Sequence, residues 1–61
     1  MNKYEVFFTR GVKEEKILVD TETSFDEFLA EMGEAAREGS YVSFSSFAIP
    51  ARSVTLIREV E

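Results

Sequence analysis

The chain has 61 residues, with seven lysines and arginines against twelve aspartates and glutamates, and a formal net charge of −5. Its lack of cysteine and histidine excludes disulfides and ordinary zinc sites, which stabilise many small proteins. A chain of this size buries only about 60% of its unfolded surface, so we expect one domain over residues 1–61 that depends on dense packing or self-association.

The N-terminal third predicts a β-hairpin. Residues 3–10 alternate aromatic and β-branched side chains on one face, and residues 14–20 repeat such an alternation. Gly11 lies between them and indicates the turn. Residues 1–8 lack the features of a signal peptide, and no apolar run approaches the roughly 18 residues of a membrane span. We therefore expect a cytoplasmic protein.

Residues 24–39 carry the clearest helical pattern. Ser24 and Glu27 form a capping box, and Gly39 suits the left-handed position that ends a helix. Apolar side chains recur at helical spacing and predict the face that packs on a sheet: Phe25, Phe28, Leu29, Met32 and Ala36.

The remaining residues predict two further strands, over residues 40–46 and about 54–60. Pro50 places a turn between them, at residues 50–53. The expected fold is therefore α+β with a ββαββ order, in which a four-stranded antiparallel sheet is covered on one face by the helix.

The uncovered face of that sheet is expected to be partly apolar. Alternation places one large apolar side chain from each strand there: Phe7, Leu18, Tyr41 and Ile57 (with Leu56 as the alternative to Ile57). A contiguous apolar patch of this kind favours a binding or self-association surface over scattered exposed side chains. We expect a homo-oligomer, a protein partner, or both.

The acidic excess is concentrated in residues 20–38, which carry seven carboxylates and Arg37 as their one basic residue. This distribution argues against direct binding to nucleic acid, although an acidic helix could imitate a nucleic-acid backbone and inhibit a basic groove. Helical spacing predicts one acidic face: Glu27, Glu31, Glu34 and Glu38. Such carboxylates could serve a small metal-dependent enzyme, but a solvated helix face is the simpler interpretation, and we expect no metal.

Catalytic motifs are missing from the sequence. The chain offers no histidine or cysteine as a base or nucleophile, and no phosphate-binding or dinucleotide-binding fingerprint. We therefore expect a non-catalytic interaction module without a cofactor and without a membrane partner.

One segment near the C-terminus resembles the corresponding part of short uncharacterised proteins encoded by phages and mobile elements, which share a hairpin, a helix and a closing hairpin. The residues that carry the resemblance are Phe47, Ala48, Ile49, Pro50, Ala51, Ser53, Val54 and Ile57. The resemblance implies no catalytic residue, and it implies a protein that binds or inhibits a host protein. The same residues are equally typical of a turn with apolar flanks.

Overall fold

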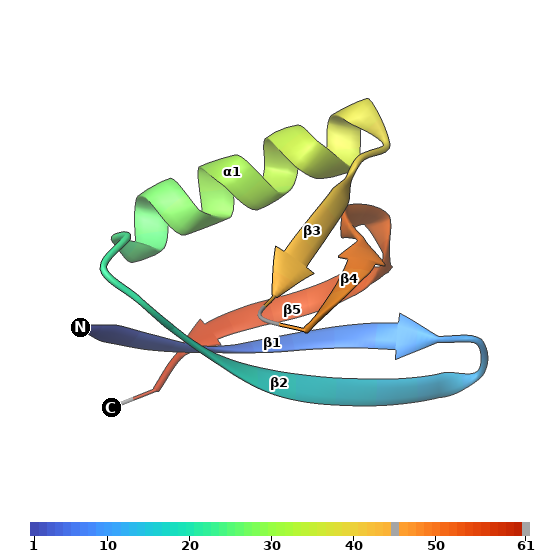
Figure 1. The fold of residues 1–61 in the computed structure, drawn as a ribbon, viewed down its shortest axis with the longest axis horizontal. Helices are drawn as coiled ribbons and strands as arrows, with labels where there is room; N and C mark the ends of the chain where they lie inside the picture. The colour runs from blue at the N-terminus through green and yellow to red at the C-terminus, as the bar shows by residue number, and fades with distance from the viewer. Residues whose placement is uncertain (45, 61) are drawn as a thin grey trace.

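The computed structural model describes residues 1–44 and 46–60 and confirms an α+β fold in which a helix packs over antiparallel strands (Figure 1). In chain order the elements are β1 (Asn2–Arg10), β2 (Lys13–Thr21), α1 (Phe25–Glu38), β3 (Tyr41–Phe44), β4 (Phe47–Pro50), the short 3₁₀ helix η1 (Ala51–Ser53) and β5 (Val54–Glu59). Within the described residues, no helix combines the length and the hydrophobicity that a membrane crossing requires.

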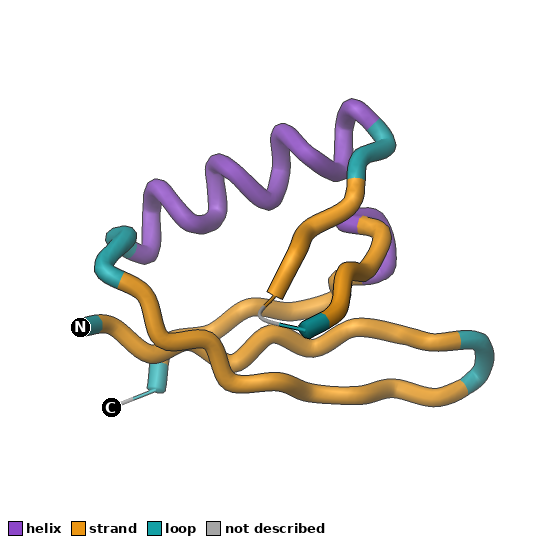
Figure 2. The backbone as a smooth tube through the Cα atoms, viewed as in Figure 1, coloured by secondary structure: helices purple, strands orange, loops and turns teal. Residues whose placement is uncertain are grey.

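The predicted four-stranded sheet is wrong in its pairing. The strands form a three-stranded sheet in the order β2-β1-β5 and a separate hairpin of β3 and β4 (Figure 2). The difference arises because residues 47–50, expected in a connection, pair with the strand just before them, from Phe44↔Phe47 to Tyr41↔Pro50. Pro50 then ends β4, and η1 occupies the predicted turn. Residue 45, inside the predicted third strand, lies outside the described residues.

The hairpin of β1 and β2 agrees with the prediction. Its two-residue turn has a positive φ of 64° at Gly11, whereas no non-glycine residue described has a positive φ. This is the pattern of a type II′ turn, which matches the twist of the flanking strands. The two strands then pair without interruption from Arg10↔Lys13 to Asn2↔Thr21.

The core lies between the three-stranded sheet and α1. Tyr4, Val6 and Phe8 are buried at alternate positions of the central strand, and Phe28 and Met32 of the helix form one cluster with Tyr4 and Val6. The rings of Tyr4 and Phe28 are 5.0 Å apart. Leu29, predicted on the packed face, is 39% exposed, so the packed stripe is narrower than expected.

Both predicted helix ends are confirmed. The Ser24 hydroxyl accepts a hydrogen bond from the Glu27 amide at 3.3 Å, and Gly39 ends the helix with a φ of 74°. A third contact was not foreseen from the sequence. The Nε of Arg52 donates to the Ala36 carbonyl at 3.1 Å, which also accepts from the Gly39 amide, so a side chain of η1 adds to the capping of the last helical turn.

The start of the helix is tied to the first strand by one buried phenol. The Tyr4 hydroxyl donates to the Thr23 carbonyl at 2.6 Å, which fixes the segment between β2 and α1. Burial, together with the nearby Glu59 carboxylate, raises the pKa of Tyr4 above its ordinary value of 10.0. The phenol therefore stays a hydrogen-bond donor across the physiological pH range.

Candidate functional site

The outer face of the three-stranded sheet, defined as the face opposite α1, differs from the predicted patch. Tyr41 lies in the β3–β4 hairpin rather than in this sheet. Ile57 pairs with Val6 and packs against the core, so its predicted place on this face is wrong, and Leu56 lies opposite Phe7 instead. The cause is a register shift at Phe7 and Phe8, because an extra residue in β5 breaks the strict alternation that the prediction assumed.

The remaining apolar side chains of the outer face are separated by charges. Glu5 pairs with Arg58 and with Lys16, whose Nζ is 3.2 Å from its carboxylate. Both cations also cover the Phe7 ring, with Lys16 Nζ at 5.9 Å and Arg58 Cζ at 5.3 Å from its centroid. The hydrogen bond from Arg58, followed by that from Lys16, holds the pKa of Glu5 below its ordinary value of 4.5.

Leu18 and Leu56 are the large apolar side chains that the outer face exposes, at 57% and 50%. The register places them diagonally across the sheet, because Leu18 lies opposite Glu5 and Leu56 lies opposite Phe7. The charged network therefore lies between them. The outer face is a mixed polar surface with two isolated leucines rather than a contiguous apolar patch.

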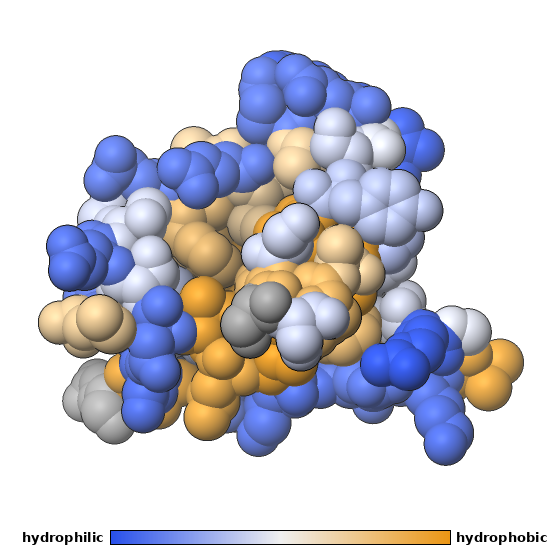
Figure 3. Space-filling view, viewed as in Figure 1, coloured by the Kyte–Doolittle hydropathy of each residue, from blue (hydrophilic) through white to orange (hydrophobic). Residues whose placement is uncertain are grey.

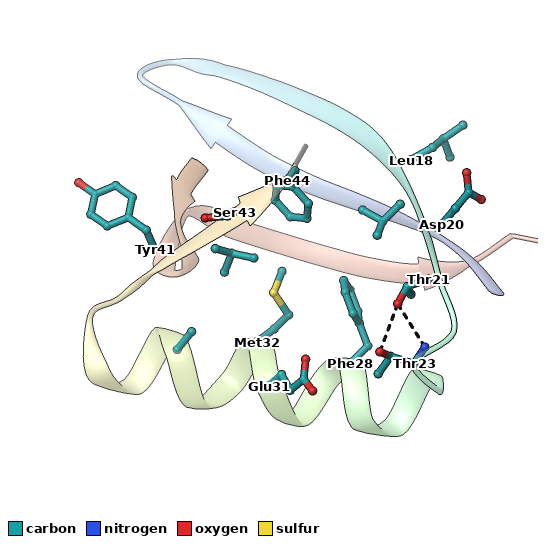
Figure 4. Close-up of a pocket in the computed structure, with 13 residues that line it drawn as sticks. Leu18, Asp20, Thr21, Thr23, Phe28, Glu31, Met32, Tyr41, Ser43 and Phe44 are labelled. Atoms are coloured by element: carbon teal, nitrogen blue, oxygen red, sulfur yellow. Dashed lines mark hydrogen bonds between the residues drawn. The ribbon is translucent and has the colours of Figure 1, made fainter. Parts of the chain in front are cut away.

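A different surface has the form of a binding site. An open groove with a volume of about 670 Å³ lies between β2, α1 and β3, within the range of about 300–1,000 Å³ that is typical of ligand sites. Phe28, Met32 and Phe44 point into it from the helix and from β3 (Figure 4). The space-filling view shows apolar surface gathered between hydrophilic margins on this side of the molecule (Figure 3). The lining residues are Leu18, Val19, Asp20, Thr21, Thr23, Phe28, Glu31, Met32, Ala35, Tyr41, Val42, Ser43 and Phe44.

Two unpaired strand edges border the groove. β2 is an edge of the three-stranded sheet, and β3 pairs only with β4 among the described residues. In an antiparallel pair, alternate residues turn their amide and carbonyl groups away from the partner strand. The two-residue turn makes Arg10 and Lys13 a hydrogen-bonded pair. Hydrogen-bonded and non-hydrogen-bonded pairs alternate from there along the hairpin, so Leu18 and Asp20 belong to non-hydrogen-bonded pairs. Their amide and carbonyl groups therefore point away from β1, toward the groove.

The same count applies to β3. Pro50 has no amide hydrogen, so its pair with Tyr41 belongs to the type without cross-strand hydrogen bonds. The backbone groups of Tyr41 and of Ser43, two residues later, therefore also point away from β4. Tyr41, predicted for the outer face of the sheet, lies instead at the margin of the groove and is 68% exposed.

The groove carries negative charge. Asp20 and Glu31 belong to its lining, which includes no lysine or arginine. The predicted acidic helix face is exposed at all four positions, and Glu31 brings it to the groove: Glu27, Glu31, Glu34 and Glu38. Glu34 pairs with Arg37 and Glu27 accepts from the Ser24 hydroxyl. Within the part of the chain that the structure describes, no three acidic side chains converge as a metal site would require.

One end of the groove is closed by the connection from β2 to the helix. The Thr23 amide donates to the Thr21 hydroxyl oxygen at 3.2 Å, and this hydroxyl in turn donates to that of Thr23 (Figure 4). The sequence predicts Phe28 and Met32 in the core, and they are buried there, but it does not predict that they line a groove beside β3. No signal in the sequence specified that β3 pairs with β4 rather than with β2.

Taken together, the fold and the groove define a small two-layer α+β protein with an open, acidic, apolar-lined side. No protein-family model, curated protein or solved structure matches the chain.

Proposed function

We propose that the chain is a non-catalytic interaction module that binds another protein through the groove between β2, α1 and β3. The observation that carries the proposal is the combination of an apolar floor with unpaired strand edges. Apolar side chains supply the area that association removes from water, and free backbone groups supply the hydrogen bonds. The expectation of a host protein as the partner fits this interpretation, and the expectation of a cytoplasmic location stays a prediction.

A display selection against the immobilised protein tests the proposal. Random peptides are selected on the wild type and then measured on Val42→Trp, which enlarges a half-buried side chain in the groove wall. Val12→Trp makes the same change at a fully exposed turn and is the matched control. We expect selected peptides to bind the wild type and Val12→Trp, and to lose binding to a folded Val42→Trp. Peptides that bind all three proteins equally would contradict the proposal.

Self-association through the outer face is a second candidate, supported by the exposure of Leu18 and Leu56. Because the cations of Lys16 and Arg58 cover Phe7, the informative substitution is Leu56→Glu. Light scattering at several concentrations should then show a wild-type dimer that Leu56→Glu dissociates. A wild type that stays monomeric at millimolar concentration would remove this candidate and leave the groove proposal intact.

An alternative prediction is that the acidic helix face imitates a nucleic-acid backbone and binds the basic groove of another protein. Binding of this kind must weaken steeply with salt, because it depends on screened charges. Binding that ignores salt would refute it.

A further inference from the structure

We propose that the occupant of the groove is an extended, basic peptide segment of a partner protein that adds as a strand to the free edge of β2. This inference rests on the proposed function and specifies the chemistry of the partner. Three features carry it: the direction of the free backbone groups, the apolar floor and the sign of the charge.

The backbone groups favour β2 as the docking edge. β2 has nine residues and β3 has four, so β2 offers the longer unpaired ladder. Leu18 and Asp20 direct their outward amides and carbonyls to the groove, as the pairing with β1 requires. A strand added there extends the three-stranded sheet and satisfies these groups by the β-augmentation mode of peptide recognition.

The floor of the groove favours a peptide that alternates apolar and polar residues. Side chains of an added strand point alternately to the two faces of the sheet, with about 6.6 Å between those on one face. Those on the helix side meet Phe28, Met32 and Phe44, which point into the groove (Figure 4). Those on the other side stay in solvent and can be charged.

The charge of the groove favours lysine or arginine at the polar positions. Asp20, opposite Lys3, lies on the face of β2 to which the polar side chains of an added strand point, Glu31 is exposed on the helix wall, and the lining has no basic residue. Asp20 has one distant partner, Lys3, at 4.0 Å, and Glu31 takes part in no ion pair that the described residues form. A second copy of this chain is disfavoured as the occupant, because it would bring a net charge of −5 to an acidic groove.

The test is a nuclear magnetic resonance titration of the full chain with the capped peptide Lys-Val-Lys-Val-Lys-Val-Lys. We expect saturable shifts centred on the amides of Leu18, Asp20 and Ser43, with protection of the Leu18 amide from solvent exchange. The capped peptide Glu-Val-Glu-Val-Glu-Val-Glu is the charge control and should produce no saturable shift.

Two pairs of variants locate the docking edge and the charge. Leu18→Pro removes an outward amide of the groove, whereas Glu14→Pro removes an outward amide near the hairpin turn, and proline is tolerated at such edge positions. We expect Leu18→Pro to abolish the protection that the peptide gives to the neighbouring outward amide of Asp20, and Glu14→Pro to keep it. Asp20→Asn with Glu31→Gln should weaken binding of the lysine peptide about 2- to 30-fold, since two exposed ion pairs contribute roughly 0.2–1 kcal/mol each and about 1.4 kcal/mol is tenfold. Glu14→Gln with Glu22→Gln is the control for charge number.

The outcomes separate the two proposals. Shifts confined to other surfaces, equal binding of the acidic peptide, or no shift at millimolar lysine peptide would overturn the strand-addition inference. If the display selection still yields groove-dependent ligands of helical or acidic character, the groove remains a binding site and only its partner chemistry is wrong. If Leu18→Pro fails to fold, the double variant Asp20→Asn with Glu31→Gln tests whether charge contributes to binding. Peptide-dependent protection of the Leu18 amide in the wild type then tests whether β2 is the docking edge.

Discussion

Two glycines of the same helix region should respond in opposite directions to the same substitution. Gly33 lies inside α1, and a Cβ built there meets nothing within 4 Å. Gly33→Ala should therefore stabilise the fold by about 0.5–1 kcal/mol, because glycine loses more conformational freedom in a helix than alanine does. Gly39 has a φ of 74°, and Gly39→Ala should destabilise the fold by about 1–2 kcal/mol, since a left-handed conformation is costly for any residue with a Cβ.

Space does not decide the second case. The nearest atom to a Cβ at Gly39 is the end of the flexible Arg52 side chain, at 3.6 Å, so the cost comes from the backbone conformation. The two variants should differ by about 2 kcal/mol, which corresponds to melting temperatures roughly 8–16 °C apart for a domain of this size. Thermal unfolding followed by circular dichroism measures the difference. If both substitutions shift the melting temperature in the same direction, the assignment of α1 and of its end is wrong.

Three further predictions concern the core, the helix start and the outer face. Phe28→Ala should lower the free energy of unfolding by about 3–5 kcal/mol, because Phe28 is only 8% exposed. Leu29→Ala should lower it by less than about 1 kcal/mol, because Leu29 is 39% exposed. Urea unfolding measures both values, and equal losses would contradict the assignment of the packed helix face. Ser24→Ala should cost about 1 kcal/mol through the lost cap, with Ser24→Asp as the variant that restores it. Glu5→Gln should lower the melting temperature at pH 7, because the ionised Glu5 carboxylate stabilises the fold at every pH above its unfolded pKa of 4.5. This stabilisation is lost as the pH falls from 4.5 through the lowered pKa of Glu5 in the folded protein, so the difference between variant and wild type should vanish there. A difference that persists in acid would assign the loss to packing instead of charge.

Local signals predicted the parts of the fold that depend on neighbouring residues. The turn at Gly11, the cap at Ser24 and the end at Gly39 each require a particular residue for a particular backbone geometry, and all three are in the structure. The same signals predicted the general α+β arrangement, because the apolar stripe of an amphipathic helix must be buried against the apolar face of a sheet.

The pairing of the C-terminal strands could not be predicted in this way. Alternation of side chains shows which residues share a face of one strand, but it does not show which strand lies beside it. The error in β5 has the same origin. Val54 and Ile57 both face the core although they are three positions apart, because the register shift places one extra residue in β5 while their partners on β1, Phe8 and Val6, are two positions apart. Strict alternation therefore exchanged Leu56 and Ile57.

The candidate site was predicted only in its components. The acidic helix face was foreseen, and so was the burial of Phe28 and Met32, but their meeting at an open groove depends on where β3 lies. The predicted outer patch failed for a different reason. Lys16 and Arg58 are long enough to cover Phe7 while their charges reach Glu5, and a pattern of apolar residues does not register such coverage.

The position of β1 at the centre of its sheet has a consequence for how the chain folds. β1 supplies the fully buried side chains, yet one of its two neighbours is the last strand, with Tyr4 opposite Glu59. During synthesis the first hairpin and the helix can form early, because their contacts are local, whereas the sheet stays incomplete along one edge of β1 until residue 59 has left the ribosome. A polypeptide arrested before β5 would therefore expose the hydrogen-bonding edge of its most apolar strand, and such an edge is a site of aggregation.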